Sequence, residues 1–600
     1  MYLNNTTIQE SLPLSIEETS VPSSPRPKPI FKPYNNRQGI MILDIAGLIP
    51  EHHVARVIDE FVEAINDEIF YPYFPGGGRA SYHPKMMTKI LLYAYSQKVY
   101  SCREIAKMTK ENIPMMWLAA MEQPDFRTIN RYRSSTLEGL IDELFVESIY
   151  LLLEQNYIQF DHYFLDGTKI EADANKYSFV WKKSAQKFDA RFKEKIQTTL
   201  EEIHSITEME EKELLAEAIA EQTTDRRTLE KIAASYAAEI DALTEQIKEE
   251  KDVETRKELR SKRTAMKKPA KKLEDDVLPN LEKYEQQIEI CGEHRNSYSK
   301  TDNDATFMRT KDDHMKNGQL KPCYNVQMAT ENQFILSYSI HQNPTDTRCF
   351  IPHMDKLAAS RLPVPKVVIA DAGYGNETNY LYAQEGEDGQ ARFEFLIPFN
   401  TYLQEQKRSF KKDIKHVQNW TYIEEEDRFI CPNERSVEFK RYSKRTDKYG
   451  YTRDFKIYEC EDCSDCPLKE LCTKAKGNRQ VHYNPVYEEL KAKAKKALED
   501  EQLQAIYALR KIEVESVFGH LKGNRSFRRF SLRGMKKVHI EFGIVAMAHN
   551  LLKVAGIRQL LSLKIKENGK QVNRKTKIAI HLFYNLGAFW TAPFRGLKYV

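Results

Sequence analysis

Two apolar runs far apart in the chain each end in an aspartate, and this pattern restricts the possible fold more than any other feature. Residues 366–375 read KVVIADAGYG, so a short β-branched run reaches Asp371 before two glycines end it. Residues 162–172 read HYFLDGTKIEA, and there the apolar run reaches Asp166. A single aspartate of this kind is usually a turn or helix cap. Two of them indicate strands that bring distant carboxylates together, where a cation or hydrogen-bond donors must offset burial.

Length and charge set broad limits. The 600 residues suffice for about four domains. The 91 Lys and Arg residues nearly balance the 87 Asp and Glu residues, so affinity for nucleic acid would have to come from local clusters. No apolar run approaches the roughly 18 residues of a membrane span, and the N-terminus does not resemble a signal peptide. We therefore expect a soluble intracellular protein without membrane contact, whose nine cysteines are reduced or bind metal.

The first half of the chain is predicted to be mostly helical. Residues 1–40 are rich in Ser, Pro and Lys and predict a flexible leader. Residues 41–153 have a helical pattern that includes Arg127 and Arg131 in a short basic helix. This block is either a helix-turn-helix DNA reader or a packing domain with a solvated basic face. Residues 186–290, rich in Glu, Lys, Ala and Leu, predict long paired helices or a coiled coil.

Strand patterns return after this helical insertion. Residues 324–342 contain two β-rich runs separated by a turn at 330–332, which predicts a hairpin. A helix follows, then the strand that ends at Asp371, and then a further strand in RFEFLIPF. With the Asp166 strand placed first, this order predicts a mixed α/β sheet in which Asp166 and Asp371 leave neighbouring strands.

Five cysteines gather in one short region. The stretch YECEDCSDCPLKELC supplies Cys460, Cys463, Cys466 and Cys472, and Cys431 lies before them. Four thiolates complete the tetrahedral shell of a structural Zn²⁺, so we predict zinc held by Cys460, Cys463, Cys466 and Cys472, with Cys431 as the alternative ligand. An iron–sulfur cluster uses similar spacings, but nothing else in the sequence indicates redox chemistry.

A third acid is expected on a helix near the end of the chain. In LRKIEVESVFGHLKGNRSFRRFSLRGMKKV, a 3.6-residue period gathers one apolar face: Ile512, Val514, Val517, Phe518 and Leu521. Glu515, Gly519 and Lys522 lie along one edge of this face, and Glu513 and His520 lie along the other. Glu515 is the better candidate, because Gly519 leaves room for a ligand and Lys522 can reach a phosphate.

A basic tract without acids follows Glu515. Its candidate DNA-binding residues are Lys522, Arg525, Arg528, Arg529 and Arg533. Phe527 and Phe530 lie between them. Such a cluster of cations suits the phosphate backbone of nucleic acid, although the average charge of the chain conceals it.

Together these residues resemble the DDE transposases of bacterial insertion sequences, whose catalytic domain has an RNase H-like fold. The resemblance rests on LDGTKIEA with NKYSFVWKK, on YNVQ, on ADAGYGNE and on VESVFGHLKGNRSFRRF, together with the helical N-terminal block and the cysteine cluster. It implies that Asp166, Asp371 and Glu515 are the catalytic acids and hold two Mg²⁺ or Mn²⁺ ions. A related signature places a Tyr and an Arg before the Glu. Here Tyr507 and Arg510 stand one residue further from Glu515 than that pattern expects, which leaves their roles open.

The resemblance also implies an activity and partners. Such an enzyme cleaves DNA at element ends and transfers the strands to a target by in-line displacement at phosphorus. The expected partners are double-stranded DNA, as terminal inverted repeats and target, and a second copy of the chain. The expected location is the bacterial cytoplasm, on the nucleoid when DNA is bound. Two alternatives remain, a nuclease of the same fold that does not join strands and a non-catalytic zinc-containing DNA-binding regulator.

The expected organisation is an α/β RNase H-like mixed-sheet core with an all-helical N-terminal domain, a long helical insertion and a small Cys-rich insertion. The core is predicted in three parts, at 154–185, 291–425 and 483–560. The helical insertion at 186–290 and the Cys-rich insertion at 426–482 separate these parts, and a tail at 561–600 ends the chain. Three further acids compete with the three chosen: Asp302, Asp304 and Asp346.

Overall fold

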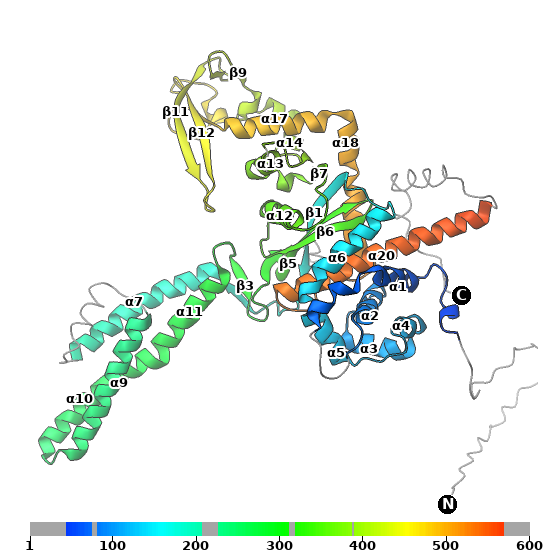
Figure 1. Ribbon diagram of the computed structural model, residues 1–600. Coiled ribbons are helices and arrows are strands. Elements are labelled where there is room, and N and C mark those ends of the chain that lie inside the picture. The colour runs from blue at the N-terminus through cyan, green and yellow to red at the C-terminus, as the bar shows by residue number, and fades with distance from the viewer. Residues whose placement is uncertain (1–43, 75–80, 207–225, 311–317, 387–388, 569–600) are drawn as a thin grey trace, which may run out of the picture. The chain divides into compact units, whose positions relative to one another are not determined.

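Figure 1 shows the structure, a computed structural model that describes residues 44–74, 81–206, 226–310, 318–386 and 389–568. The predicted leader at 1–40 lies outside the described residues. So does most of the predicted tail, although residues 561–568 belong to the last helix.

Short helices form the N-terminal block, in agreement with the sequence pattern. They are α1 (Val54–Ala64), η2 (Asp67–Ile69), η3 (Tyr71–Tyr73), α2 (Pro84–Ser96), α3 (Cys102–Glu111), α4 (Ile113–Leu118), α5 (Phe126–Arg131), η4 (Tyr132–Thr136) and α6 (Leu137–Glu154), preceded by η1 (Ala46–Leu48). Asp125 begins α5 by accepting the Thr128 N–H at 2.6 Å. Arg127 and Arg131 are exposed. The third arginine of this stretch, Arg133, is instead buried and donates to the Tyr95 hydroxyl and the Tyr100 carbonyl.

A six-stranded mixed sheet lies at the centre of the chain. Its strands are β4 (Thr306–Arg309), β5 (Leu320–Glu331), β1 (His162–Glu171), β7 (Val367–Ile369) and β8 (Glu394–Leu396), in that order, with β6 (Phe334–His341) also paired to β5. β1 runs antiparallel to β5 and parallel to β7, and β7 runs parallel to β8. The Asp166 and Asp371 strands are therefore neighbours, as the order of elements predicted.

The β5–β6 hairpin was predicted correctly, but its turn was placed too early. Glu331 still belongs to β5, and the turn residues are Asn332 and Gln333. Both have positive φ, at 51° and 60°, which is typical of a type I′ hairpin turn. Glu331 also accepts the backbone N–H groups of Gln159 to His162, so the end of β5 fixes the start of β1.

Further helices lie between and after the later strands of the central sheet. They are η6 (Asp346–Arg348), α12 (Phe350–Ala359), η7 (Ala372–Tyr374), α13 (Glu377–Gln384), α17 (Pro485–Glu499), α18 (Glu501–Ala508), η9 (Lys511–Glu515), α19 (Ser516–Gly519), η10 (His520–Asn524) and α20 (Met535–Asn568). α20 packs on β6, α6 and α2. Within the described residues it is the one helix long and apolar enough to cross a membrane, contrary to the sequence expectation that no such run exists, but 83% of its apolar window is buried in the protein. Because it is mostly buried, α20 is better described as a core helix.

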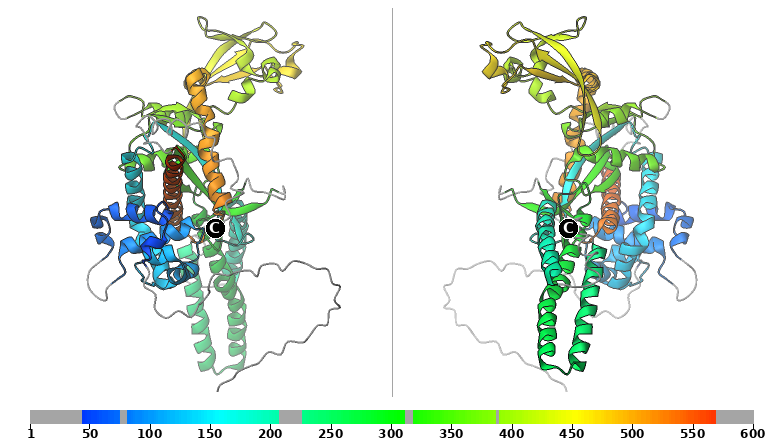
Figure 2. Two further views of the ribbon diagram at one scale, coloured as in Figure 1. Left: turned by 90° about the vertical axis from the view of Figure 1, so that its right-hand side faces the viewer. Right: turned by 90° about the vertical axis from the view of Figure 1, so that its left-hand side faces the viewer.

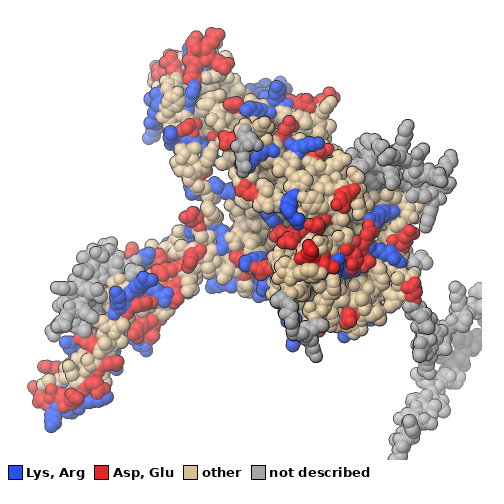
Figure 3. Space-filling view, viewed as in Figure 1, with Lys and Arg blue, Asp and Glu red and all other residues tan. Residues whose placement is uncertain are grey.

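A helical insertion separates β1 from β4. It contains α7 (Lys182–Ile206), α9 (Arg226–Glu249), α10 (Val253–Lys272), η5 (Leu273–Val277) and α11 (Leu278–Cys291), and its base is the pair β2 (Phe179–Trp181) and β3 (Ser297–Ser299). α9 packs on α10 and α7 on α11, as Figure 2 shows. The insertion has its own apolar core, and its surface mixes acidic and basic side chains (Figure 3).

The five clustered cysteines lie on or beside a second, five-stranded antiparallel sheet, with Cys460 at the end of one strand. The order of its strands is β13 (Gln480–Tyr483), β12 (Thr452–Cys460), β11 (Ser436–Thr446), β10 (Arg428–Ile430) and β9 (Thr421–Ile423). The short helices of this part of the chain are α14 (Tyr402–Glu405), α15 (Arg408–Lys412), η8 (Val417–Asn419) and α16 (Lys469–Cys472). Its core is small and includes Trp420, Phe429, Tyr458 and Cys460.

Candidate active site

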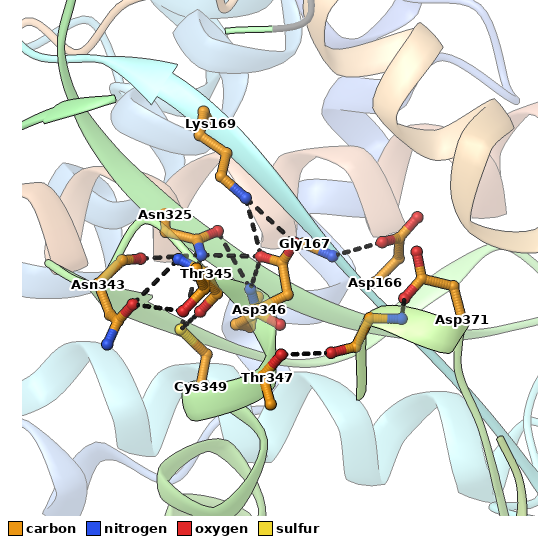
Figure 4. Close-up of polar contacts among 12 residues, drawn as sticks. Asp166, Gly167, Lys169, Asn325, Asn343, Thr345, Asp346, Thr347, Cys349 and Asp371 are labelled. Atoms are coloured by element: carbon orange, nitrogen blue, oxygen red, sulfur yellow. Dashed lines mark hydrogen bonds and ion pairs between the residues drawn. The ribbon is translucent and has the colours of Figure 1, made fainter. Parts of the chain in front are cut away.

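Asp166 and Asp371 lie at the same level of two neighbouring parallel strands. Phe164 of β1 lies opposite Ile369 of β7, and each acid stands two residues further along the chain. Asp166 lies within β1, which continues to Glu171 contrary to the expectation of a strand end, whereas Asp371 follows the end of β7. Their carboxylates lie next to each other in Figure 4. Asp166 is 6% exposed and accepts the Gly167 N–H at 2.7 Å, while Asp371 accepts the Gly373 N–H at 2.8 Å. The local backbone therefore fixes one oxygen of each acid.

The segment that follows β6 supports both acids from one side of the sheet (Figure 4). Asp346 packs against Gly167, where the absence of a Cβ lets the Asp346 and Gln327 side chains approach the backbone. Asp346 pairs with Lys169 at 2.9 Å and accepts from Asn325 and Gln327. The YNVQ stretch thus contributes its two amides to this support.

The same segment also reaches the Asp371 strand. The Thr347 hydroxyl donates to the Gly373 carbonyl, and the Gly373 N–H donates to Asp371. A chain of contacts therefore runs from Gly167, beside Asp166, through Asp346 and Thr347 to the loop that carries Asp371. Sequence reasoning did not find this connection, because its members are distant along the chain.

Glu515 lies on the helical segment that follows α18, and Arg510 joins it to the sheet. The Arg510 Nη1 atom is 3.4 Å from Asp166 Oδ2, and its Nη2 atom is 3.8 Å from Glu515 Oε1. The Glu515 side chain is 57% exposed, whereas that of Arg510 is 15% exposed. One guanidinium thus lies between a strand acid and the helix acid.

Tyr507 lies close to the same acids, and Lys522 contacts the strand that carries Asp166. Burial raises the pKa of Tyr507, and the charged groups that act on it include Arg510, Asp371 and Asp166. The Lys522 Nζ atom donates to the Lys169 carbonyl of β1 at 3.0 Å, so it connects the helical segment to the strand of Asp166.

The helical segment differs in one respect from the predicted apolar face. Val514, Val517 and Leu521 are buried as expected. Ile512, however, is 36% exposed. The prediction assumed a regular α-helix, but residues 511–515 form a π-helical turn, η9, which changes the angular position of the residues before Val514.

The three competing acids have other partners. Asp302 accepts from the Tyr324 hydroxyl at 2.8 Å, and Asp304 accepts the Met535 N–H at the start of α20. Burial alone would raise the pKa of Asp346, but Lys169 and the amide donors outweigh it, and the pKa is lowered. Asp302 and Asp304 thus contact other elements, whereas Asp346 lies beside Gly167, next to Asp166.

The basic tract is only partly directed to solvent. Arg525 is half-buried and donates to the Ser96 carbonyl. Arg529 and Arg533 are exposed but pair with Asp173, at 3.0 and 2.9 Å. Arg528 is exposed and donates to the Lys522 carbonyl through Nε. The acid that pairs with this tract is Asp173, which follows β1 and is distant from the tract in sequence. The local sequence therefore could not reveal the pairing.

All five clustered cysteines line one cavity of the second sheet: Cys431, Cys460, Cys463, Cys466 and Cys472. Burial and the neighbouring Cys463 raise the pKa of Cys460 to about 12. As the side chains stand in the part of the chain that the structure describes, no group of three or more His, Cys, Asp or Glu is arranged to hold a metal ion.

The donor chemistry of the acid site nevertheless fits a hard divalent cation. Carboxylate oxygens are the protein ligands that Mg²⁺ prefers, and Mg²⁺ completes its shell with water and substrate oxygens. Asp166 and Glu515 already share one cation, the Arg510 guanidinium. Asp166, Asp371 and Glu515 are therefore the residues that would hold such ions.

Two family models match the chain. The one described as Transposase DDE domain matches residues 430–555, a range that contains Glu515 but neither Asp166 nor Asp371. The one described as Transposase domain matches residues 43–135, within the helical N-terminal block. No curated protein and no solved structure shows significant similarity to the chain.

Proposed function

Because the chain is a DDE-type transposase of an insertion sequence, we propose that Asp166, Asp371 and Glu515 form an active site that cleaves DNA at the element ends and transfers the strands to a target. The parallel pairing of β1 with β7 carries this proposal, since it sets Asp166 beside Asp371 just beyond the last β1–β7 pair. Glu515 completes the set through its contact with Arg510.

The residues of the chain have distinct tasks in this proposal. Two Mg²⁺ or Mn²⁺ ions, when bound by the three carboxylates, would promote attack and departure at phosphorus. Asp166 and Asp371 keep fixed positions because backbone N–H groups hold one oxygen of each. The exposed Glu515 carboxylate can adjust as substrate enters. The basic tract holds phosphates beside the scissile bond, which positions the strand without reading its sequence.

The DNA partners follow from the same reaction. We assign base reading to the helical N-terminal block, where Arg127 and Arg131 are exposed. The partners are then the terminal inverted repeats and the target DNA. Because two ends must be joined to one target, the active complex is proposed to contain two copies of the chain.

A cleavage and joining assay tests the proposal. Purified protein is incubated with Mg²⁺, a labelled duplex of the DNA that flanks the coding sequence, and a supercoiled plasmid as target. Cleaved duplex together with label joined to plasmid supports a transposase. Cleavage without joined product favours the nuclease, and binding without cleavage favours the regulator. Chelation of the metal with EDTA should stop both steps.

We also propose one structural Zn²⁺ per chain in the cysteine-lined cavity. The second sheet has a small apolar core, and a closed thiolate shell would stabilise it as metal binding does in other small domains. Elemental analysis of protein purified without added metal should give about one zinc per chain. Cys463→Ser or Cys466→Ser should lose the zinc, whereas Cys291→Ser, a buried cysteine of the helical insertion, should retain it. Absence of zinc, or iron with visible absorbance, contradicts the assignment.

A further inference from the structure

Arg510 and Glu515 contact the same site although their spacing in sequence does not suit an α-helix. At 3.6 residues per turn, two residues five positions apart point about 140° away from each other. Side chains that meet on an α-helix are three or four positions apart. Yet Arg510 lies within 4 Å of Glu515 and also of Asp166, at 3.8 and 3.4 Å.

The π-helical turn η9 (Lys511–Glu515) resolves this conflict. A π turn closes with i→i+5 hydrogen bonds and so contains one residue more than an α turn. The residues on either side of it, Arg510 and Ser516, have ordinary helical dihedrals, so the helical path continues through the turn. A second π turn, η10, follows the short helix α19. It brings residues five apart onto one face, and it moves Ile512 out to solvent.

Contacts from other elements hold the turn in place. Glu513, in the middle of the turn, accepts the Gln333 N–H of the β5–β6 hairpin at 2.6 Å. Lys553 of α20 donates to the Gln333 side chain at 3.0 Å, and its charge acts on Glu513. Val514 is fully buried beside them. The bulge is thus fixed by tertiary structure and is not a frayed helix end.

We propose that the η9 turn is the element that admits Arg510 to the active site, and that Arg510 is a positioning residue which holds the helix-borne Glu515 against the strand-borne Asp166. The inference rests on the proposed function, since it concerns the geometry of that site. It also explains why Tyr507 and Arg510 can stand one residue further from Glu515 than the related signature expects: the bulge absorbs the additional residue.

Two opposite changes of equal size test this inference. Deletion of the exposed Lys511 converts the π turn to an α turn and leaves Arg510 and Glu515 four apart, so the contact survives. An alanine inserted between Lys511 and Ile512 adds a second extra residue and turns Arg510 away from the site. We expect the deletion to retain cleavage of the labelled end duplex within about fivefold of the wild type and the insertion to lose about a hundredfold, as a misplacement of about 1 Å already can.

The outcomes separate this inference from the proposed function. A wild-type protein that does not cleave contradicts the function itself. With an active wild type, equal loss in both variants shows that the segment tolerates no change of length, and equal retention shows that its geometry is irrelevant; either result overturns the inference. Thermal unfolding of each variant confirms that the fold is intact, and a variant that fails to fold is replaced by the same change made at Ile512.

A mutant cycle adds a readout that a merely structural role would not change. Arg510→Gln should lower cleavage by the same factor in the wild type and in the Lys511 deletion, because Arg510 occupies the site in both. It should have no further effect in the insertion, where Arg510 has already left. Arg510→Lys should recover part of the activity lost in Arg510→Gln. An Arg510→Gln effect of equal size in all three backgrounds contradicts the proposal.

Discussion

The candidate active site joins two regions that are built in different ways. Asp166 and Asp371 belong to adjacent strands, and backbone donors hold them. Glu515 lies on a helical segment and meets Asp166 through the Arg510 side chain. The Asp166 side chain is 9% exposed and that of Glu515 is 57% exposed. Backbone pairing therefore sets the sheet region, whereas the helix region depends on side-chain contacts and has room to adjust.

Neutralising any one of the three acids should have the largest effect and would show whether both regions belong to one site. Asp166→Asn, Asp371→Asn and Glu515→Gln each remove a proposed metal ligand with little change of shape. Loss of several kcal/mol of transition-state stabilisation should slow cleavage in Mg²⁺ by about a thousandfold or more. Binding to end duplexes should persist, as a gel-shift titration can measure. A wild-type cleavage rate from any of the three would remove that residue from the site.

Changing side-chain length should separate the two regions. Asp166→Glu adds a methylene where the carboxylate is buried and held, so we expect a loss of about a hundredfold in cleavage rate. Glu515→Asp shortens an exposed side chain on the adjustable helix, and we expect a loss of about tenfold. Single-turnover kinetics at saturating DNA make the comparison. Equal losses would mean that the helix region is as rigid as the sheet region.

A methyl group at Gly167 should disturb the sheet region alone. The added Cβ would lie well inside contact distance of the Gln327 amide and the Asp346 carboxylate. Gly167→Ala should therefore destabilise the fold by about 1–3 kcal/mol, as overpacking does, and lower cleavage about tenfold. Gly556→Ala in α20, where nothing lies within 4 Å of the new Cβ, is the matched control: it should keep the cleavage rate and should not lower the stability, since alanine favours a helix more than glycine does. Urea unfolding and the cleavage assay measure the two effects, and an unchanged Gly167→Ala would show that Asp346 does not support the site.

The smallest effect on chemistry is expected from the basic tract of the helix region. Arg528→Ala should weaken binding to end and unrelated DNA equally and flatten the salt dependence by about one slope unit. Arg529→Ala should change the slope less, because Asp173 already pairs with this arginine. Cleavage of saturated DNA should stay within about twofold for both. A loss of affinity confined to end DNA would mean that the tract reads sequence, and no loss would place these arginines on a solvated face.

The sequence foretold the sheet region better than the helix region. The apolar run before each aspartate and the hairpin pattern suffice to predict the strands, because apolar runs and turn residues are local signals. The order of the elements then predicts that the two aspartate strands are neighbours. The role of Arg510 stayed open, because Arg510 stands one residue further from Glu515 than the related signature expects, and a π turn leaves no mark on a helical period of 3.6. The spacing of five between Arg510 and Glu515, one residue more than the signature expects, is the signal in the sequence that could have raised the question.

Long-range pairing explains the remaining gaps. The sequence indicates a basic tract without acidic partners, but in the fold Arg529 and Arg533 form ion pairs with Asp173. Arg133 follows Arg131 by two positions, but hydrogen bonds to Tyr95 and Tyr100 hold it in the core. In each case the partner comes from another element, so no window of local sequence contains the interaction.

The helical insertion has a consequence for the chain entropy that folding must overcome. Glu171 of β1 pairs with Cys323 of β5 across about 150 residues, and closing such a long loop is entropically costly. The β2–β3 pair and a 2.9 Å hydrogen bond from Lys182 N to the Asn296 carbonyl close the base of the insertion. Once the insertion has folded from its local contacts, the remaining loop is about 40 residues long, and the cost falls by about 1 kcal/mol. The helical insertion, to which no chemistry is assigned, thus lowers the entropic cost of pairing β1, the strand of Asp166, with β5.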